Sequence, residues 1–168
     1  KAIKDAGKIR IGGVQTSSFF SLLDETDNKT RGFDAGLSQL LSRYILGDEW
    51  GTELIQVTSD TRESVLQNGQ VDAVFATYSI TDERKKLIAF AGPYYSSQQG
   101  ILIQASNTEI KGLADLAGKV VAAQSGSTGP KIIEEYAPDV KEIQEFKTSE
   151  EAVAALTQGR VDAYVFDF

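Results

Sequence analysis

The sequence predicts an α/β protein whose strands are mostly parallel and belong to two similar lobes. Short apolar runs alternate with segments of helical periodicity along the whole chain, the order typical of βαβ units. A repeat supports two lobes, because residues 66–73 match residues 156–163 at a fixed offset of 90 positions. With 168 residues, 41% hydrophobic and 24% charged, the chain has the length and composition of one large or two small globular domains.

The charge and the missing residue types exclude several functions. The net charge is −7 and the pI about 4.7, which argues against nucleic-acid binding because that function needs a basic face. The sequence contains no Cys and no His, so disulfides, thiolate or His-ligated metal sites and Ser-His-Asp or Cys-His catalysis are excluded within it. It also lacks Met and any apolar run near the ~20 residues of a membrane span, so we expect a processed mature chain or a fragment.

The elements of the first lobe are predicted by apolar periodicity and by the residues that stop each run. Gly32 and Gly47 bracket a segment with apolar residues at helical spacing, and Asn68-Gly69 ends a shorter one. The predicted elements are a strand at 8–11, a helix at 33–46, a strand at 53–57, a helix at 61–67 and a strand at 71–75. We assign residues 1–93 to the first lobe and residues 94–98 to a hinge.

The second lobe, residues 99–168, has the same kind of alternation. Its predicted elements are an extended run at 100–103, a helical turn at 113–116, a strand at 120–123, a helix at 131–136, a strand at 140–146, a helix at 149–157 capped by Ser149, and a strand at 161–166. A second match joins residues 6–9 to residues 117–120, at an offset of 111 positions. Either a convenient helix-to-strand connection recurs by chance, or the lobes share one design.

Polar residues stand where two of the predicted parallel strands end. The 90-residue offset places Thr77 on Asp167, and the carboxyl ends of parallel strands are where open α/β sheets bind ligands. Ser79 adds a small hydroxyl, and Arg84 follows it. Arg84 either begins a solvated helix capped by Thr81 or offers a planar fork to a carboxylate. A cation in one lobe and a carboxylate in the other suit a zwitterion such as an amino acid.

Three further features allow a ligand role or an ordinary one. The Gly126 to Gly129 segment either presents backbone amides to an anion or is a plain loop. One of Phe19 and Phe20 is expected in the core, and the other can cover the aliphatic part of a ligand. Arg62 begins a helix, where a cation is mildly unfavourable, so it either meets an external anion or lies on the surface.

Together these segments resemble the polar amino-acid-binding proteins of bacterial ABC importers, a periplasmic-binding-protein family. The matching motifs occur throughout the chain in this order: Ile11-Gly12 leading to Phe20, Gly32-Phe33-Asp34, Leu66 to Asp72, Ser79 to Lys86, Phe90 to Tyr95, Leu113 to Lys119, Gly126-Ser127-Thr128 and Gly159 to Ala163. Residues 76–80 and Arg62 are most similar to the glutamate/aspartate-binding branch. The resemblance implies a two-lobe type II periplasmic-binding-protein fold with no cofactor and no metal.

The resemblance also implies roles for particular residues. Arg84 would pair with the α-carboxylate of an amino acid, helped by Ser79 and by the backbone amide of Thr128. Asp167 would take the α-ammonium group together with Thr77 or its carbonyl.

Three more residues would contact the rest of the ligand. Phe20 would cover its carbon chain, Arg62 would meet an acidic side chain, and Gln124 would contact the side chain as well. Ser18-Phe19-Phe20 replaces the usual Pro-Pro-Phe of the family, Thr16 replaces a common acidic residue, and no second arginine stands near Val14. Acidic specificity would therefore rest on Arg62, and a glutamine or asparagine ligand stays open.

Relatives of this family continue well past Asp167, so the lobes are expected to be incomplete and the chain truncated at its C-terminal end. Uncovered apolar surface would then favour dimerisation or strand exchange. The expected function is that of an extracytoplasmic binding protein, periplasmic or a cell-surface lipoprotein, which delivers an amino acid to a membrane permease and is not an enzyme. The alternatives are a dehydratase of the same fold, which would use Glu, Asp or Lys, and the sensor domain of a membrane receptor.

Overall fold

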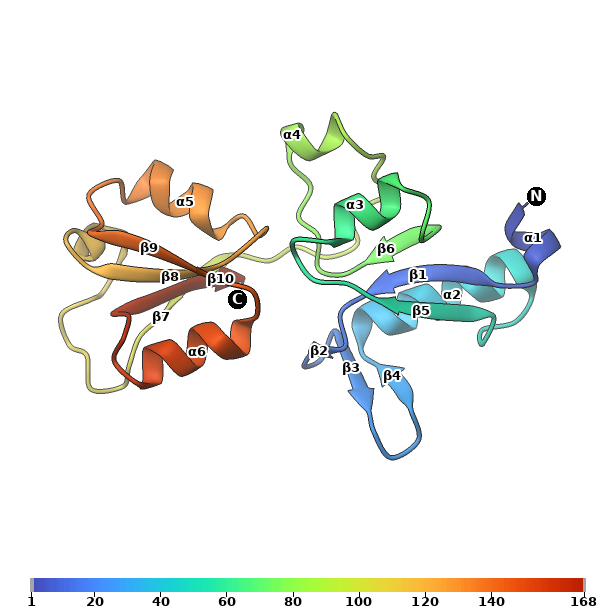
Figure 1. Cartoon of the computed structure of the whole chain (residues 1–168), viewed down its shortest axis with the longest axis horizontal. Coiled ribbons are helices and arrows are strands. Elements are labelled where there is room, and N and C mark those ends of the chain that lie inside the picture. Colours follow the sequence, from blue (N-terminus) through green and yellow to red (C-terminus); the bar gives the residue numbers. More distant parts are fainter. Residues whose placement is uncertain (1, 168) are drawn as a thin grey trace. The chain divides into compact units, whose positions relative to one another are not determined.

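The computed structural model describes residues 2–167 and divides into two compact units, Lys1–Ala91 and Gly92–Phe168. Positions 1 and 168 of the predicted lobes lie outside the described residues. The elements of unit 1 are α1 (Ala2–Ala6), β1 (Ile9–Gly13), β2 (Thr16–Ser17), β3 (Ser21–Asp24), β4 (Lys29–Arg31), α2 (Phe33–Leu46), β5 (Thr52–Gln56), α3 (Arg62–Gln67), β6 (Ala73–Phe75) and α4 (Asp82–Lys85) (Figure 1). The hinge at 94–98 stays a prediction.

Unit 1 is built on a parallel sheet in the order β5-β1-β6. Ile11 pairs with Leu54 on one side and with Ala73 on the other. Helix α2 contacts all three strands, and α3 contacts β1 and β6 (Figure 1). A separate antiparallel sheet, β2-β3-β4, leads into α2, and the sequence analysis did not predict it.

Unit 2 has one strand more in its main sheet. Its elements are β7 (Gln99–Leu102), the 3-10 helix η1 (Leu113–Leu116), β8 (Val120–Gln124), α5 (Gly129–Tyr136), β9 (Glu142–Phe146), α6 (Ser149–Thr157) and β10 (Ala163–Asp167). The sheet order is β7-β10-β8-β9, in which β8, β9 and β10 are parallel and β7 runs antiparallel to β10. The predicted parallel α/β alternation is thus confirmed, with β7 as the antiparallel exception.

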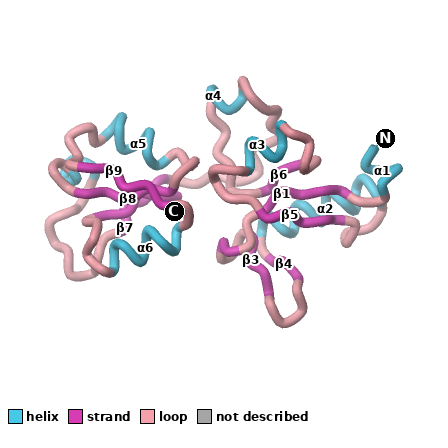
Figure 2. Tube along the Cα trace, viewed as in Figure 1, coloured by secondary structure: helices cyan, strands magenta, loops and turns pink. Residues whose placement is uncertain are grey.

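The sheet of unit 2 is covered on both faces, by α5 and by α6 (Figure 2). One apolar cluster joins Val121 and Val165 of the sheet to Ile133 of α5, and the other joins Ala122 to Leu156 of α6. Neighbouring residues of β8 thus point to opposite clusters, as the pleat of a strand requires. Burial on both faces explains why these strands are continuous apolar runs in the sequence.

The internal repeat is present in the backbone hydrogen bonds. Asp72 exchanges two hydrogen bonds with Arg10 of β1, and Asp162 exchanges two with Val120 of β8. Each aspartate accepts a backbone N–H through its carboxylate and donates its own N–H to the same residue. Gly69 and Gly159 both have a positive φ, +69° and +71°, which turns the chain from helix to strand. Two units of the form βαβαβ therefore share one design.

The second repeat match needs a correction of one residue. Arg10 and Val120 make the equivalent hydrogen bonds, and they are 110 positions apart rather than 111. The sequence match holds at Gly7 and Gly118, which both have a positive φ. Unit 1 then has one more residue between this glycine and the equivalent strand position.

Helices α2 and α6 differ from the predictions in burial and in capping, and α3 and α5 begin one residue later and two residues earlier than predicted. Helix α2 has the predicted bounds, but it buries Asp34, Ala35, Ser38 and Ser42, while Leu40 and Tyr44 of its apolar stripe are exposed. The cap of α6 is Thr148 and not Ser149: its hydroxyl accepts the N–H of Glu151, whose carboxylate accepts the N–H of Thr148. This reciprocal capping box satisfies the N–H groups of Thr148 and Glu151.

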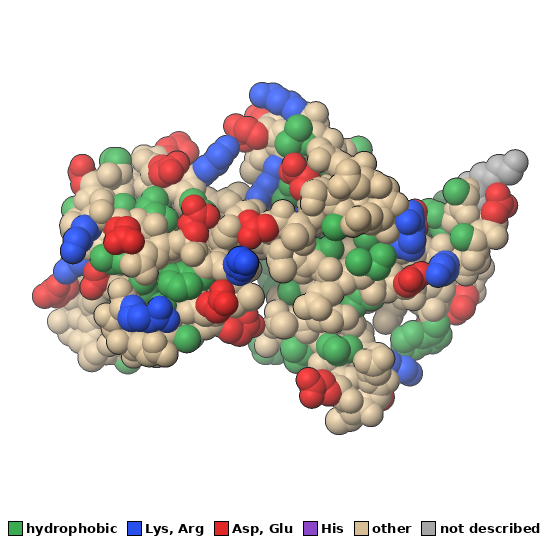
Figure 3. Space-filling view, in the orientation of Figure 1, with side chains coloured by type: hydrophobic (Ala, Val, Ile, Leu, Met, Phe, Trp, Pro, Cys, Tyr) green, Lys and Arg blue, Asp and Glu red, His purple; other side chains and the backbone are tan. Residues whose placement is uncertain are grey.

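The surface carries acidic and basic side chains interspersed on the face drawn in Figure 3. Within residues 2–167, no helix is both long enough and apolar enough to cross a membrane.

Candidate functional site

Two buried side chains of opposite charge, Asp34 and Arg62, form hydrogen bonds to the backbone of the turn after β6. The Asp34 carboxylate accepts the N–H of Thr77 at 2.9 Å, and Arg62 Nη1 donates to the carbonyl oxygen of Ala76 at 2.8 Å. Asp34 and Arg62 are only 1% and 3% exposed. Thr77 has a φ of +47°, an uncommon value for a residue with a side chain. The two charged groups therefore bond directly to the backbone of a turn that has an uncommon conformation.

Arg62 is thus a buried residue, and the alternative of a surface position is wrong. Besides the Ala76 carbonyl, its Nη1 lies 3.5 Å from the carbonyl oxygen of Thr77. Its guanidinium carbon is 4.2 Å from the centre of the Tyr78 ring. These contacts explain a cation near a helix start: the helix presents it to carbonyl groups, which offset the cost of burying its charge.

Arg84 lies in the same region of unit 1, half-buried in α4. Its Nη1 donates to the carbonyl oxygen of Ser79 at 2.9 Å, and its backbone N–H donates to the hydroxyl of Thr81 at 3.2 Å. The cap predicted at Thr81 is therefore confirmed. Because a short helix and a backbone carbonyl both hold Arg84, this arginine is positioned as a component of the turn.

Phe20 is connected to this turn through Asp34. The carbonyl oxygen of Phe20 accepts the N–H groups of Asp34 and Ala35 at the start of α2. Gly32 permits this close approach, because a Cβ at its position would lie 2.3 Å from that oxygen. Of the two neighbouring aromatics, Phe19 is 89% exposed and Phe20 is half-buried, so neither lies in the core.

Unit 2 ends its sheet with a carboxylate. Asp167 is the last residue of β10, and its partner in the antiparallel ladder is Gln99 of β7. The Gln99 amide donates to the Asp167 carboxylate and lies 3.4 Å from the hydroxyl of Thr128 at the start of α5. One side chain thus links two of the residues predicted to bind a ligand.

The loop between β8 and α5 positions Gln124 and Thr128. Ser127 donates through its hydroxyl to the Gln124 carbonyl at 2.6 Å and accepts the N–H of Gly129 at 3.1 Å. The side-chain amide of Gln124 donates to the carbonyl of Lys147 and accepts from the Ser149 hydroxyl. The segment therefore has a fixed internal structure.

The structure groups the eight predicted residues by unit. Unit 1 brings together Arg62, Thr77, Ser79 and Arg84, and Phe20 is linked to this group through Asp34. Unit 2 brings together Asp167 and Thr128, and Gln124 lies at the start of the loop that carries Thr128. The Arg84 guanidinium and the hydroxyls of Thr77 and Ser79 in unit 1 can donate hydrogen bonds to a carboxylate. The carboxylate of unit 2 can receive an ammonium group.

Sequence reasoning missed three residues of these groups: Asp34, Tyr78 and Gln99. Asp34 stands in the quoted motif Gly32-Phe33-Asp34, and an acid within an otherwise apolar helix start was a signal for a buried contact. Tyr78 lies between Thr77 and Ser79. The role of Gln99 depends on the antiparallel pairing of β7 with β10, which no local pattern predicts.

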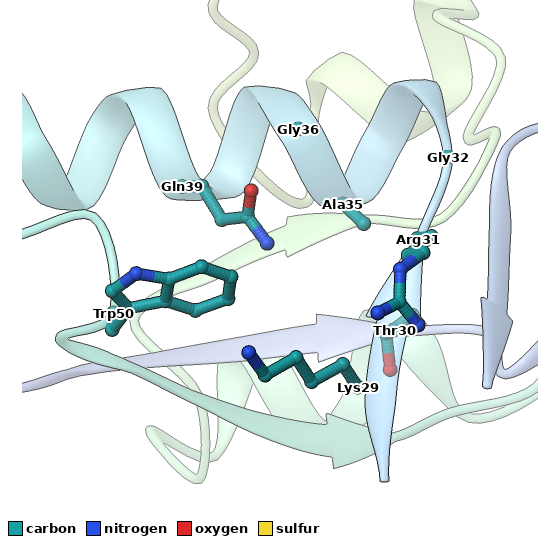
Figure 4. A pocket seen from close by; sticks show the side chains of 8 residues that line it. All are labelled: Lys29, Thr30, Arg31, Gly32, Ala35, Gly36, Gln39 and Trp50. Atoms are coloured by element: carbon teal, nitrogen blue, oxygen red, sulfur yellow. The ribbon is translucent and has the colours of Figure 1, made fainter. Parts of the chain in front are cut away.

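None of the eight predicted residues lines the cavity found in unit 1. It has a volume of about 250 Å³ and is lined by Lys29, Thr30, Arg31, Gly32, Ala35, Gly36, Gln39 and Trp50 (Figure 4). The Lys29 ammonium stands 4.6 Å from the Trp50 ring, and Arg31 pairs with Asp24 and Asp27. No group of acidic side chains in the described part of the chain is arranged to hold a metal ion.

Comparison with known proteins identifies the family. The sequence pattern of the bacterial extracellular solute-binding proteins, family 3, matches residues 9–158. The ABC transporter glutamine-binding protein GlnH of Bacillus subtilis (strain 168) is 38% identical over 167 residues, 99% of this chain and 60% of that protein. The glutamate-binding protein GluB of Corynebacterium efficiens is 35% identical over 150 residues, 86% of this chain and 51% of that protein. The chain thus spans less than two thirds of the curated relatives it matches.

Solved structures agree with the sequence match. An ancestral arginine-binding protein bound to glutamine is 37% identical with a TM-score of 0.86, over 96% of this chain and 69% of that one. This similarity confirms the predicted α/β periplasmic-binding-protein fold, and these relatives are binding proteins rather than enzymes. Because the family pattern covers most of the sequence, the chain belongs to the bacterial extracellular solute-binding proteins, family 3.

Proposed function

We propose that this chain is the amino-acid-binding part of an ABC importer and grips its ligand by both charged ends. The observation that carries the proposal is the division of charge between the units. Arg84 beside the Ser79 turn offers a cation in unit 1, and Asp167 with Gln99 and Thr128 offers a carboxylate in unit 2. An L-amino acid has the complementary pair of charges, with an α-carboxylate for Arg84 and an α-ammonium for Asp167.

The other predicted residues fit subsidiary roles in this grip. The Ser79 hydroxyl and the Thr128 amide would assist Arg84, and Thr77 or its carbonyl would assist Asp167. The half-buried ring of Phe20 would cover the carbon chain, and Gln124 would contact the side chain of the ligand.

The ligand that we propose is glutamine, with glutamate as the alternative. The sequence motifs alone favour the glutamate/aspartate branch, and acid recognition would then depend on Arg62. The contacts of Arg62 weigh against that role, since its guanidinium donates to the Ala76 carbonyl and lies against the Tyr78 ring within unit 1. The identity with a glutamine-binding relative, 38%, is also slightly higher than with a glutamate-binding one, 35%.

The proposed partner is a membrane permease that receives the amino acid. The proposed location is outside the cytoplasm, where the protein is either periplasmic or a cell-surface lipoprotein. The family description, bacterial extracellular solute-binding proteins, supports this location. Closure of the units around the ligand by hinge motion is the mode of delivery that we propose.

Calorimetric titration of the intact protein with L-glutamine, L-glutamate, L-asparagine and L-aspartate tests this proposal. We expect glutamine to bind at least about 10-fold more tightly than glutamate, since a neutral amide needs no free cation for its side chain. Preference for the two acids would restore Arg62 as a side-chain clamp. Failure of all four amino acids to bind would contradict the proposed function.

A further inference from the structure

Tyr78 lies against two arginines of unit 1, Arg62 and Arg84, and the local sequence does not predict these contacts. The guanidinium carbons of Arg62 and Arg84 lie 4.2 Å and 4.3 Å from the centre of its ring. These are cation–π distances, at which the face of an aromatic ring attracts a guanidinium. Tyr78 therefore contacts both arginines beside the turn that carries Thr77 and Ser79.

The ring is itself held in place by two other contacts. Its hydroxyl donates to the carboxylate of Glu63 in the first turn of α3, and the Phe90 ring lies 5.6 Å away at an angle of 48°. Burial and the hydrogen bond to Glu63 raise the pKa of Tyr78 to about 12, although the two arginines lower it. The phenol thus stays protonated and donates to Glu63 at any physiological pH.

A fixed ring beside Arg84 has a direct consequence for binding. A free arginine side chain loses rotamer entropy when a ligand immobilises it. Contact with the ring, together with the hydrogen bond from Nη1 to the Ser79 carbonyl, restricts Arg84 before any ligand arrives. Preorganisation of this kind raises affinity without adding a contact to the ligand.

Arg62 adds a second positive charge against the same ring, and Glu63 supplies a negative charge at the far end of the phenol. The positive charges of Arg62 and Arg84 therefore both lie close to the Tyr78 ring. A carboxylate that binds Arg84 would be attracted by both cations, although it touches only one of them.

We propose that Tyr78 is a positioning residue for the carboxylate site: its ring, anchored by Glu63, holds the Arg84 guanidinium in the orientation that receives the α-carboxylate. This inference rests on the proposed function. Tyr78 needs no contact with the ligand in this role, and it acts through Arg84.

The test compares variants of the intact protein in titrations with L-glutamine and with its α-amide, which lacks the carboxylate. Tyr78→Leu removes the ring, and Tyr78→Phe keeps the ring but loses the hydrogen bond to Glu63. We expect Tyr78→Leu to weaken glutamine binding about 10-fold and Tyr78→Phe about 3-fold, while binding of the α-amide changes less than about 2-fold in either variant. Tyr44→Leu, at an 89% exposed tyrosine of the same unit, is the matched control and should change neither ligand.

The outcomes separate the inference from the proposed function. Equal weakening of both ligands by Tyr78→Leu and Tyr78→Phe would overturn the inference, because it would indicate a general disturbance of the turn. Unchanged glutamine binding in both variants would overturn it as well. If Tyr78→Leu does not fold, Tyr78→Phe and Glu63→Gln, both conservative, still carry the test. If the unsubstituted protein binds none of the four amino acids above, the proposed function fails first and the inference fails with it.

Discussion

The two units have the same order of strands and helices but differ in the burial and the edge pairing of their last strand. Both run β-α-β-α-β with equivalent parallel strands, and both fix the last strand with an aspartate, Asp72 or Asp162. The first strands, β1 and β8, are both largely buried, and neither β5 nor β9 has a buried residue. The last strands differ: β10 has three buried residues, whereas β6 has none. Unit 2 also has β7 beside β10, while within residues 2–167 no strand pairs with the outer edge of β6.

The two units also bury different residue types at one equivalent position of the repeat. The offset of 90 places Arg62 of α3 on Ala152 of α6, which is fully buried in an apolar cluster. Unit 2 thus gains stability from apolar packing, while unit 1 buries a cation that holds the turn after β6. The same design serves as a stable scaffold in one unit and as a support for arginines in the other.

The largest expected effect comes from the core of unit 2. Ile133→Ala removes a fully buried side chain from the cluster of α5 and should lower the free energy of unfolding by about 2–5 kcal/mol. Leu40→Ala, on the 62% exposed apolar stripe of α2, should change it by less than about 0.5 kcal/mol. Denaturant unfolding of both variants checks this, and equal losses would contradict the difference in burial.

Arg62→Met tests the buried cation of unit 1. It keeps an unbranched apolar stem but leaves the Ala76 carbonyl without this donor, so unit 1 should lose about 1.5–3 kcal/mol of stability. Amide hydrogen exchange measures the loss, with faster exchange expected in unit 1 and no change in unit 2. The matched control is Arg43→Met, an exposed arginine at 3.6 Å from Glu49, which should leave exchange unchanged in both units.

The smallest expected effect compares the paired aspartates. Asp72→Ala and Asp162→Ala each remove a carboxylate that accepts a backbone N–H, a loss of about 1 kcal/mol in either unit. Asp72 also accepts hydrogen bonds from the Arg10 side chain, which lower its pKa, so Asp72→Ala should be slightly the more harmful. Urea unfolding of the two variants provides the comparison, and a larger loss for Asp162→Ala would contradict it.

The contact between Asp72 and Arg10 makes the stability of unit 1 depend on pH. Because the Asp72 pKa is lowered in the folded state, its contribution to stability is present above the unfolded value of about 3.9 and is lost as the pH falls through the folded value. Arg10→Met should therefore make unit 1 unfold at a higher pH during acid titration. An unchanged midpoint would indicate that Arg10 does not stabilise the Asp72 carboxylate.

Much of this fold follows from local sequence patterns. The run 120–123 and the stops at Gly47 and Asn68-Gly69 predict elements that the structure confirms, because each depends on nearby residues alone. The repeat predicts the shared design of the units. The β2-β3-β4 sheet was missed, since its strands are only two to four residues long. Strand β7 was not predicted to be antiparallel, since its pairing depends on residues more than 60 positions away.

The site is less predictable for the same reason. Arg84 and Ser79 lie within one turn, so the sequence brings them together, and the cap at Thr81 follows from spacing. The burial of Arg62 does not follow from the local sequence, because it depends on carbonyl groups 14 and 15 positions away. The link from Gln99 to Asp167 spans 68 positions and exists only in the folded sheet.

The most direct test of the account is a crossed titration of the intact protein with three ligands: L-glutamine, its α-amide and its deaminated analogue. Arg84→Ala should reduce glutamine affinity by about 2–5 kcal/mol and leave binding of the α-amide unchanged, because that ligand has no carboxylate for Arg84. Asp167→Ala should reduce glutamine affinity in the same range and spare the deaminated analogue, which lacks the ammonium group. This crossed pattern would establish that unit 1 takes the carboxylate and unit 2 the ammonium. Normal glutamine binding by either variant, or equal losses for all three ligands, would contradict it.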